Sequence, residues 1–246
     1  MDKIKIYCEN IDKHVEVAGG ETLGEIAARL KLDLTPICAL VNNKNEGLHY
    51  PVYAPKTVKF LSRESSNGAR VYVRSLCMML YCGLRRRYPE AVLKIEHTIG
   101  GGHFCRVSGV EVTETFLNDV RAEMHALHEA NLSFKMSEKP TEEVIADFER
   151  QGLKDKVLLL RTVHELYTKF YTLDGIADSY YGCLAPSTGA IDSFDLIKYA
   201  DGFILMGLQK EPVEHKKMFE AFTDYVKFNR VVGISNVGEM NRTVQN

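Results

Sequence analysis

Long apolar runs are absent from this sequence. Apolar stretches such as Val157–Leu160 and Phe203–Met206 are far shorter than the roughly 18 to 20 residues that a helix needs to cross a bilayer. The N-terminus alternates like a strand and lacks the apolar core of a signal peptide. With 246 residues, 45% of them apolar and 26% charged, the chain can build one large domain or two smaller ones. We therefore expect a soluble, cytoplasmic protein with no membrane partner.

Paired cysteine motifs are absent too. The sequence has 6 cysteines and no C-x-x-C pair. A chain of this size without a signal peptide does not need disulfides to hold its fold, so we expect free thiols that are mostly buried. Cys77 and Cys82 point along different faces of a helix, and His125 with His128 lacks a third ligand nearby. We expect no metal site.

A strong charge of either sign is also missing. The formal net charge of −2 gives no general attraction to phosphate backbones, although a local patch can still bind nucleic acid. The basic run Arg85-Arg86-Arg87 falls in the last turn of a predicted helix, where cations complement the helix dipole. A solvated helix end is therefore favoured over an RNA contact.

The sequence also lacks a phosphate-binding loop. Two glycine pairs have the spacing of a Walker-A loop, but Leu208 and Glu239 occupy the position of its lysine. The chain as given is therefore not expected to hydrolyse ATP by that route.

Residues 1–62 have the pattern of a small β-rich domain. Two alternating stretches around a polar turn predict a hairpin, at Ile4–Cys8 and Val15–Val17. Thr22 and Glu25 form a capping-box signature for a helix whose apolar side chains share one face. A strand, a polar turn and a closing strand are expected to follow at Ile37–Val41, Asn42–Gly47 and Thr57–Leu61. This order is that of a β-grasp fold.

The rest of the chain predicts an α+β domain at residues 70–210 and a C-terminal helix and linker at residues 211–246. Residues 63–69 are small and polar, which favours a hinge. The expected elements are a helix at Val71–Tyr88, strands at Val92–Glu96 and Phe104–Val107, and helices at Thr115–Asn131, Thr141–Gln151 (capped by Thr141) and Pro212–Phe228.

Particular motifs resemble the front end of threonyl-tRNA synthetases. The start of the first predicted helix, Thr22–Ala27, and the segment Val41-Asn42-Asn43 are similar to a TGS domain. Arg87-Tyr88-Pro89, Gly102-His103-Phe104 and above all Tyr171–Gly189 resemble the synthetase editing domain. The resemblance covers roughly residues 1 to 210 and implies a β-grasp (TGS) domain followed by an editing-like α+β domain.

The resemblance also indicates where an editing pocket would lie. In that family, H-x-x-x-H on the first helix and C-x-x-x-H in a later loop build the pocket, and residues four apart on a helix share a face. The motifs of this chain place Arg74, Met78, Tyr180 and Leu184 at those positions. Met and Leu cannot accept a proton and Arg keeps its own, so we expect no catalytic residue and no hydrolysis.

Other residues of this region remain candidates for binding a ligand. They are Arg74, His103, Asp178, Tyr180 and Tyr181. His103 is delivered by a glycine turn, and a half-buried structural histidine is an equally good interpretation of it.

The same pair of domains resembles the N-terminal half of bacterial uridine-kinase-like nucleoside kinases, and the tail Phe228–Asn246 is similar to the segment before their kinase domain. The main expectation is a non-catalytic ligand-binding or regulatory module, as a fragment of such a kinase. Its partner would be a small molecule or its own kinase domain, with ATP and magnesium only if that domain is present. An aminoacyl-tRNA deacylase and an RNA-binding module are the alternatives, with tRNA possible and not favoured.

Overall fold

The computed structural model of the chain describes residues 3–208 and 216–245. Within them the chain forms two compact units. The first contains the described residues of Met1–Glu90, Asn118–Phe134 and Tyr180–Phe194, and the second contains those of Ala91–Leu117, Lys135–Ser179 and Asp195–Asn246. The predicted α+β class is confirmed, whereas the predicted division of the chain at residues 62 and 210 stays a prediction.

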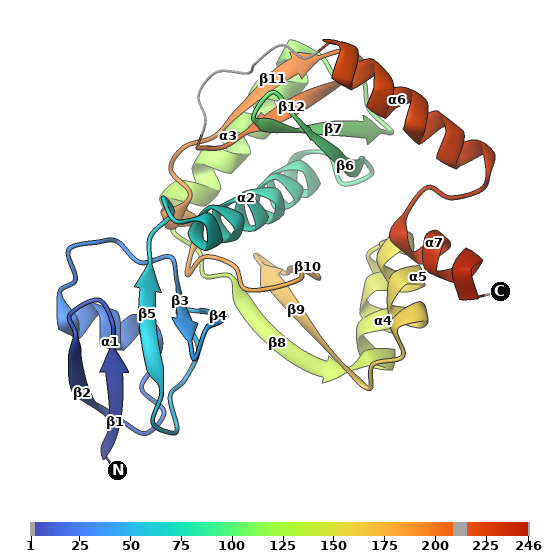
Figure 1. Cartoon of the computed structure of the whole chain (residues 1–246). Helices are drawn as coiled ribbons and strands as arrows, with labels where there is room; N and C mark the ends of the chain where they lie inside the picture. The colour runs from blue at the N-terminus through green and yellow to red at the C-terminus, as the bar shows by residue number, and fades with distance from the viewer. Residues whose placement is uncertain (1–2, 209–215, 246) are drawn as a thin grey trace. The chain divides into compact units, whose positions relative to one another are not determined.

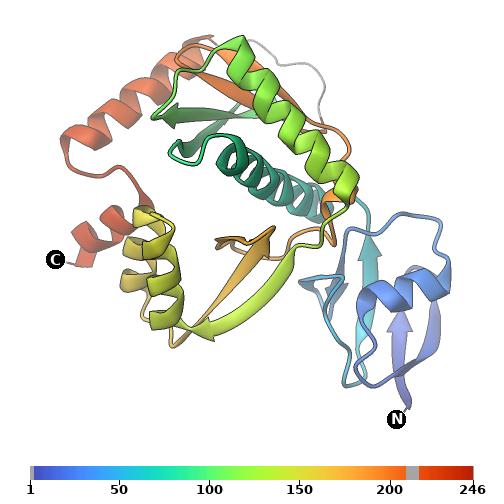
Figure 2. The same cartoon turned by 180° about the vertical axis from the view of Figure 1, so that it is seen from behind.

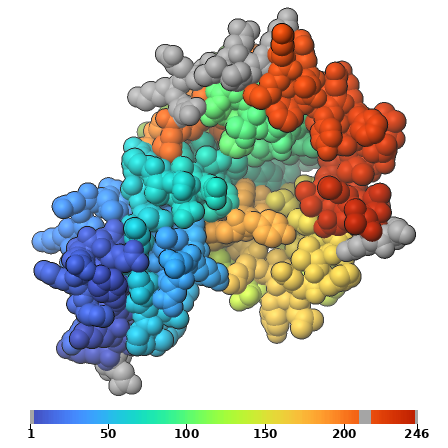
Figure 3. All heavy atoms as spheres, viewed as in Figure 1, coloured from blue at the N-terminus to red at the C-terminus, as the bar shows by residue number. Residues whose placement is uncertain are grey.

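The first unit begins with a five-stranded sheet in the order β2-β1-β5-β3-β4. The strands and the helix between them are β1 (Lys3–Cys8), β2 (Lys13–Ala18), α1 (Leu23–Leu30), β3 (Cys38–Val41), β4 (Lys44–Gly47) and β5 (Thr57–Leu61). Helix α1 lies across one face of the sheet (Figure 1 and Figure 2), where Leu23, Ile26 and Ala27 join its core. This β-grasp domain is a continuous mass of atoms, blue to cyan, in the space-filling view (Figure 3).

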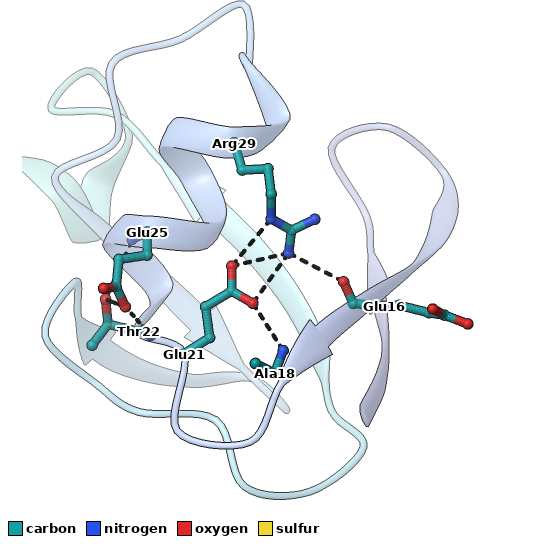
Figure 4. A network of polar contacts seen from close by, with 6 residues as sticks. All are labelled: Glu16, Ala18, Glu21, Thr22, Glu25 and Arg29. Atoms are coloured by element: carbon teal, nitrogen blue, oxygen red, sulfur yellow. Dashed lines mark hydrogen bonds and ion pairs between the residues drawn. The ribbon is translucent and has the colours of Figure 1, made fainter. Parts of the chain in front are cut away.

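The sequence signature of α1 is confirmed in atomic detail (Figure 4). The Thr22 hydroxyl accepts a hydrogen bond from the Glu25 backbone N–H at 3.3 Å, and the Glu25 carboxylate accepts one from the Thr22 N–H at 2.8 Å. Arg29 in the last turn donates to Glu21 and to the Glu16 carbonyl. The helix is therefore capped at its start and held to β2 near its end.

Strand β4 corrects the predicted polar turn at Asn42–Gly47. Only Asn42 and Asn43 form the turn, with φ of 48° and 65°. A two-residue hairpin turn requires positive φ at both residues, and asparagine tolerates this better than most residues. Lys44–Gly47 then pairs with β3, so that Gly47 lies opposite Cys38.

Helix α2 (Ser66–Arg87) follows the β-grasp domain and corrects the predicted hinge at residues 63–69. The Ser65 hydroxyl accepts a hydrogen bond from the Gly68 N–H at 3.0 Å, which caps the helix five residues earlier than expected. Helix α2 buries the apolar side chains of Leu76, Met79, Leu80 and Leu84, and Gly83 is buried as well.

Two further segments of the first unit pack beside α2. The residues of α3 (Glu114–Ala130) from Asn118 onward lie close to it, since a side chain at Gly83 would meet Met124 at 3.3 Å. The short 3-10 helix η1 (Thr188–Ala190) follows the loop at 180–187. Buried Thr188 ties it to α3 by donating to the Leu127 carbonyl at 2.5 Å.

The second unit contains a four-stranded antiparallel sheet in the order β11-β12-β7-β6. Its strands are β6 (Val92–Ile99), β7 (Gly102–Ser108), β11 (Asp195–Tyr199) and β12 (Gly202–Met206). Helix α6 (Lys216–Val231) packs on this sheet through Phe219, whose ring is 5.0 Å from that of Phe104. Residues 212–215 of the predicted helix at Pro212–Phe228 lie outside the described residues.

A three-stranded sheet in the order β10-β9-β8 completes the second unit. It is built from β8 (Lys135–Pro140), β9 (Tyr167–Leu173) and β10 (Ile176–Asp178), with helices α4 (Thr141–Arg150), α5 (Lys154–Val163) and α7 (Val237–Gln245). Thr141 does not cap α4 as predicted. Pro140 holds the cap position, and the buried Thr141 hydroxyl instead donates to the Glu165 carbonyl at 2.5 Å.

Across residues 3–208 and 216–245, no helix combines the length and apolar character needed to cross a membrane. All six cysteines are free and buried, as the sequence predicts.

Candidate functional site

The implied pocket positions come together at the contact between α2 and the loop at 180–187, both in the first unit. Arg74 donates to the Cys183 carbonyl through Nε at 3.2 Å and Nη2 at 3.1 Å. Next to it, buried Ser75 accepts a hydrogen bond from the Ala185 N–H at 2.7 Å. Two pairs of residues that are 109 and 110 positions apart in the chain are therefore held side by side.

Two of the four implied positions are part of the protein core. Met78 is 0% exposed and Leu184 is 2% exposed. Neither side chain can ligate a metal as an imidazole does or take a proton from water. At these two positions apolar side chains pack in the core, whereas the resemblance implies polar side chains there.

Arg74 is held by the backbone of the loop. Gly182 has φ of +100°, and a side chain there would come within 3.1 Å of the Arg74 guanidinium. The glycine thus lets the backbone lie against the guanidinium. Nη1 of Arg74 makes no hydrogen bond within the part of the chain that the structure describes. The arginine has donors left for an anionic ligand.

The two tyrosines of the loop differ in exposure. Tyr180 is half-buried, whereas Tyr181 is 80% exposed and directly precedes Gly182. An exposed aromatic ring such as that of Tyr181 is suited to stacking on a planar group. Both tyrosines thus belong to the loop whose Cys183 carbonyl Arg74 contacts, and their role in binding a ligand stays a prediction.

His103 and Asp178 belong to the second unit. His103 is the second residue of β7, opposite Thr98 and Leu205, and burial lowers its pKa. Its Nε2 lies 3.5 Å from the Thr98 hydroxyl. These contacts fit the structural interpretation of His103.

Asp178 pairs with a residue that the sequence analysis missed. The Lys156 ammonium is 3.1 Å from the Asp178 carboxylate and donates to the Ser179 carbonyl at 3.0 Å. The Asp178 side chain is 10% exposed. Lys156 lies on helix α5. That helix was not predicted, because the short apolar run Val157–Leu160 alone does not indicate a helix.

The basic run at the end of α2 is bonded within the protein. Arg86 and Arg87 pair with Glu123 and Asp119 of α3 at 3.8 and 3.2 Å, and Arg85 donates to the Pro89 carbonyl. Its predicted place in the last helical turn is confirmed.

The histidine pair of helix α3, His125 and His128, has structural contacts. The His125 ring lies 4.7 Å from that of Phe194, and His128 Nδ1 lies 3.3 Å from the Thr188 carbonyl. Among the described residues, no three His, Cys, Asp or Glu side chains gather closely enough to hold a metal ion.

An open cavity of about 410 Å³ lies in the second unit, between α4 and the β8-β9-β10 sheet. Lys139, Asp147 and Arg150 are among its lining residues. Asp147 already pairs with both cations. None of the candidate residues predicted from the sequence is in its lining.

Comparison with curated proteins shows similarity to threonine–tRNA ligases. The chain is 25% identical to the enzyme of Haloquadratum walsbyi over 152 residues, which cover 62% of this chain and 24% of the relative. It is 26% identical to the enzyme of Desulforamulus reducens over 192 residues, covering 76% and 30%. It is 30% identical to the enzyme of Natronomonas pharaonis over 140 residues, covering 57% and 22%.

These relatives support the resemblance to threonyl-tRNA synthetases. The chain spans less than a third of their length. They give no support to the expected attachment to a nucleoside kinase. No protein-family model matches the chain.

Proposed function

We propose that this chain is a tRNA-related module that binds the single-stranded end of a tRNA and does not cleave an amino acid from it. Similarity to threonine–tRNA ligases supports the tRNA-related part. One observation carries the non-hydrolytic part. Met78 and Leu184, at two of the four implied pocket positions, are buried apolar side chains.

The chemistry of ester hydrolysis explains why this observation matters. Water must be activated by a general base within hydrogen-bond reach. Arginine side chains are donors only, and Arg74 donates to the Cys183 carbonyl. None of the four positions has the imidazole or the thiol that the resemblance implies there.

The same loop has groups suited to binding RNA. Proteins recognise single-stranded RNA ends by stacking unpaired bases on aromatic rings and by bonding phosphates with arginine. Tyr181 offers an exposed ring, and the Arg74 guanidinium lies against the adjacent Gly182. Arg86 and Arg87 are less suited, because their charges already pair with Glu123 and Asp119.

Binding of uncharged tRNA tests the proposal. We expect the intact tRNA to bind at low salt, and the same tRNA without its single-stranded 3′ end to bind more weakly. Because stacking of one base contributes about 1–3 kcal/mol, Tyr181→Ala should weaken binding by roughly 5- to 150-fold. Fluorescence anisotropy of labelled tRNA measures both effects.

Tyr167→Ala is the matched control, since Tyr167 is 60% exposed and lies on β9 of the second unit. It should bind like the unaltered protein. Absence of tRNA binding at low salt, or equal binding of the shortened tRNA, contradicts the proposal and leaves a small-molecule or regulatory role.

A further inference from the structure

We propose that Cys38 and Cys183 form an oxidant-sensitive dithiol site, which peroxide converts to a disulfide joining β3 of the β-grasp domain to the loop at 180–187. Both residues belong to the first unit and are 145 positions apart, by subtraction of their numbers. Cys38 is 0% exposed and Cys183 is 7% exposed.

The β3–β4 hairpin brings the two side chains together. Cys38 lies directly opposite Gly47 in the antiparallel register. Side chains at such positions stand next to each other on one face of a sheet, with Cβ atoms about 4.5–5.5 Å apart. A Cβ on Gly47 would lie 3.3 Å from the Cys183 Cβ. The absence of a side chain at Gly47 therefore leaves Cys183 the space beside Cys38.

A second contact holds the loop on the same domain. His49 Nε2 lies 3.1 Å from the Pro186 carbonyl, three residues after Cys183. Together with the Arg74 bonds to the Cys183 carbonyl, this contact holds the backbone at Cys183 and three residues after it. The loop is thereby held where the Cys183 Cβ lies next to Gly47, the residue opposite Cys38, and such proximity is what a disulfide requires.

The surroundings give the two thiols different roles. The hydrogen bond from Cys38 and the nearby Arg74 charge lower the pKa of Cys183. The same hydrogen bond and burial raise the pKa of Cys38. Thiolates are the form that reacts with peroxide, so Cys183 is the attacking residue and Cys38 the resolving one.

The reaction balances in two steps. The Cys183 thiolate displaces hydroxide from hydrogen peroxide, giving a sulfenic acid, and hydroxide takes up a proton to become water. The Cys38 thiol then attacks the sulfenic sulfur, forming the S–S bond and releasing a second water. Two thiols are oxidised by two electrons and one peroxide is reduced to two waters.

The other cysteines provide internal comparisons. Burial raises the pKa of Cys8 in the same domain, so its thiol is less reactive. Cys105 lies on β7 in the second unit and is 0% exposed. Neither has a second cysteine of its own unit opposite it in the described strand register.

The test is peroxide treatment of the full chain, followed by blocking of remaining thiols and peptide mapping without reductant. We expect one cross-linked peptide pair containing Cys38 and Cys183, with loss of two hydrogen atoms from the intact mass. Cys8→Ser and Cys105→Ser should leave this product unchanged, and Cys38→Ser should stop at an oxidised Cys183.

Gly47→Ala probes the geometry without removing a thiol. Its methyl group crowds Cys183, so disulfide formation should slow by about tenfold or more as the sulfurs are pushed out of bonding geometry. Circular dichroism of each variant checks folding. A product that pairs Cys38 with Cys8, no cross-link at all, or unchanged rates in Gly47→Ala would overturn the proposal.

Discussion

Two polar arrangements of the molecule have opposite characters. In the first unit, Arg74 donates to a neutral backbone carbonyl, and Met78 and Leu184 at two of the other implied pocket positions are buried and apolar. In the second unit, Lys156 faces the carboxylate of Asp178, so a pair of opposite charges is kept with little exposure. Two positions where the resemblance implies polar chemistry are thus part of the core, whereas an ion pair elsewhere in the chain stays partly exposed.

The largest effect on stability is expected at the buried apolar positions of the first unit. Leu184→Ala should lower the free energy of unfolding by about 2–5 kcal/mol, because it removes buried contacts and leaves a cavity. Urea unfolding measures the change. Tyr181→Ala, a change at an exposed neighbour, should stay within about 0.5 kcal/mol. A similarly small effect of Leu184→Ala would mean that the position is an open pocket and not core.

A smaller effect on stability is expected when the ion pair of Lys156 and Asp178 is broken. Lys156→Met leaves the Asp178 carboxylate without its ion-pair partner and should cost about 1–3 kcal/mol, less than for a fully buried pair because the Lys156 side chain is 26% exposed. The double change with Asp178→Asn should recover part of that loss, as a double-mutant cycle requires of coupled residues.

The exposed pair of Arg161 and Glu149, with side chains 60% and 51% exposed, is the matched control. Arg161→Met should change stability by less than about 1 kcal/mol. Equal effects at both pairs would show that the pair of Lys156 and Asp178 contributes no more to stability than an exposed surface pair does.

Locally encoded elements could be predicted from the sequence. The β1–β2 hairpin, the capped α1 and the buried face of α2 each follow from residues a few positions apart. Strand β4 was missed because its sequence, Lys-Asn-Glu-Gly, is polar and its signal is only the Asn42-Asn43 turn. Strand β8 was missed for the same reason, since pairing with β9 and not its own pattern defines it.

The candidate site was predictable in its position and not in its packing. Motif spacing placed Arg74 and Tyr180 in one region, and the hydrogen bonds between α2 and the loop are consistent with that. The contact of Cys183 with Gly47 and the pair of Lys156 and Asp178 depend on segments far apart in the chain. No local pattern in the sequence indicates such contacts.

Release of labelled amino acid from tRNA charged with serine or threonine tests the non-hydrolytic claim most directly. Loss of one general base costs about 10² to 10⁴ in rate, and here no such group remains at the four implied positions. We predict no release above background, measured beside the double variant Arg74→His with Met78→His. Robust turnover by the unaltered protein, abolished by His103→Ala or Cys183→Ala, would contradict the account and identify the chain as a deacylase.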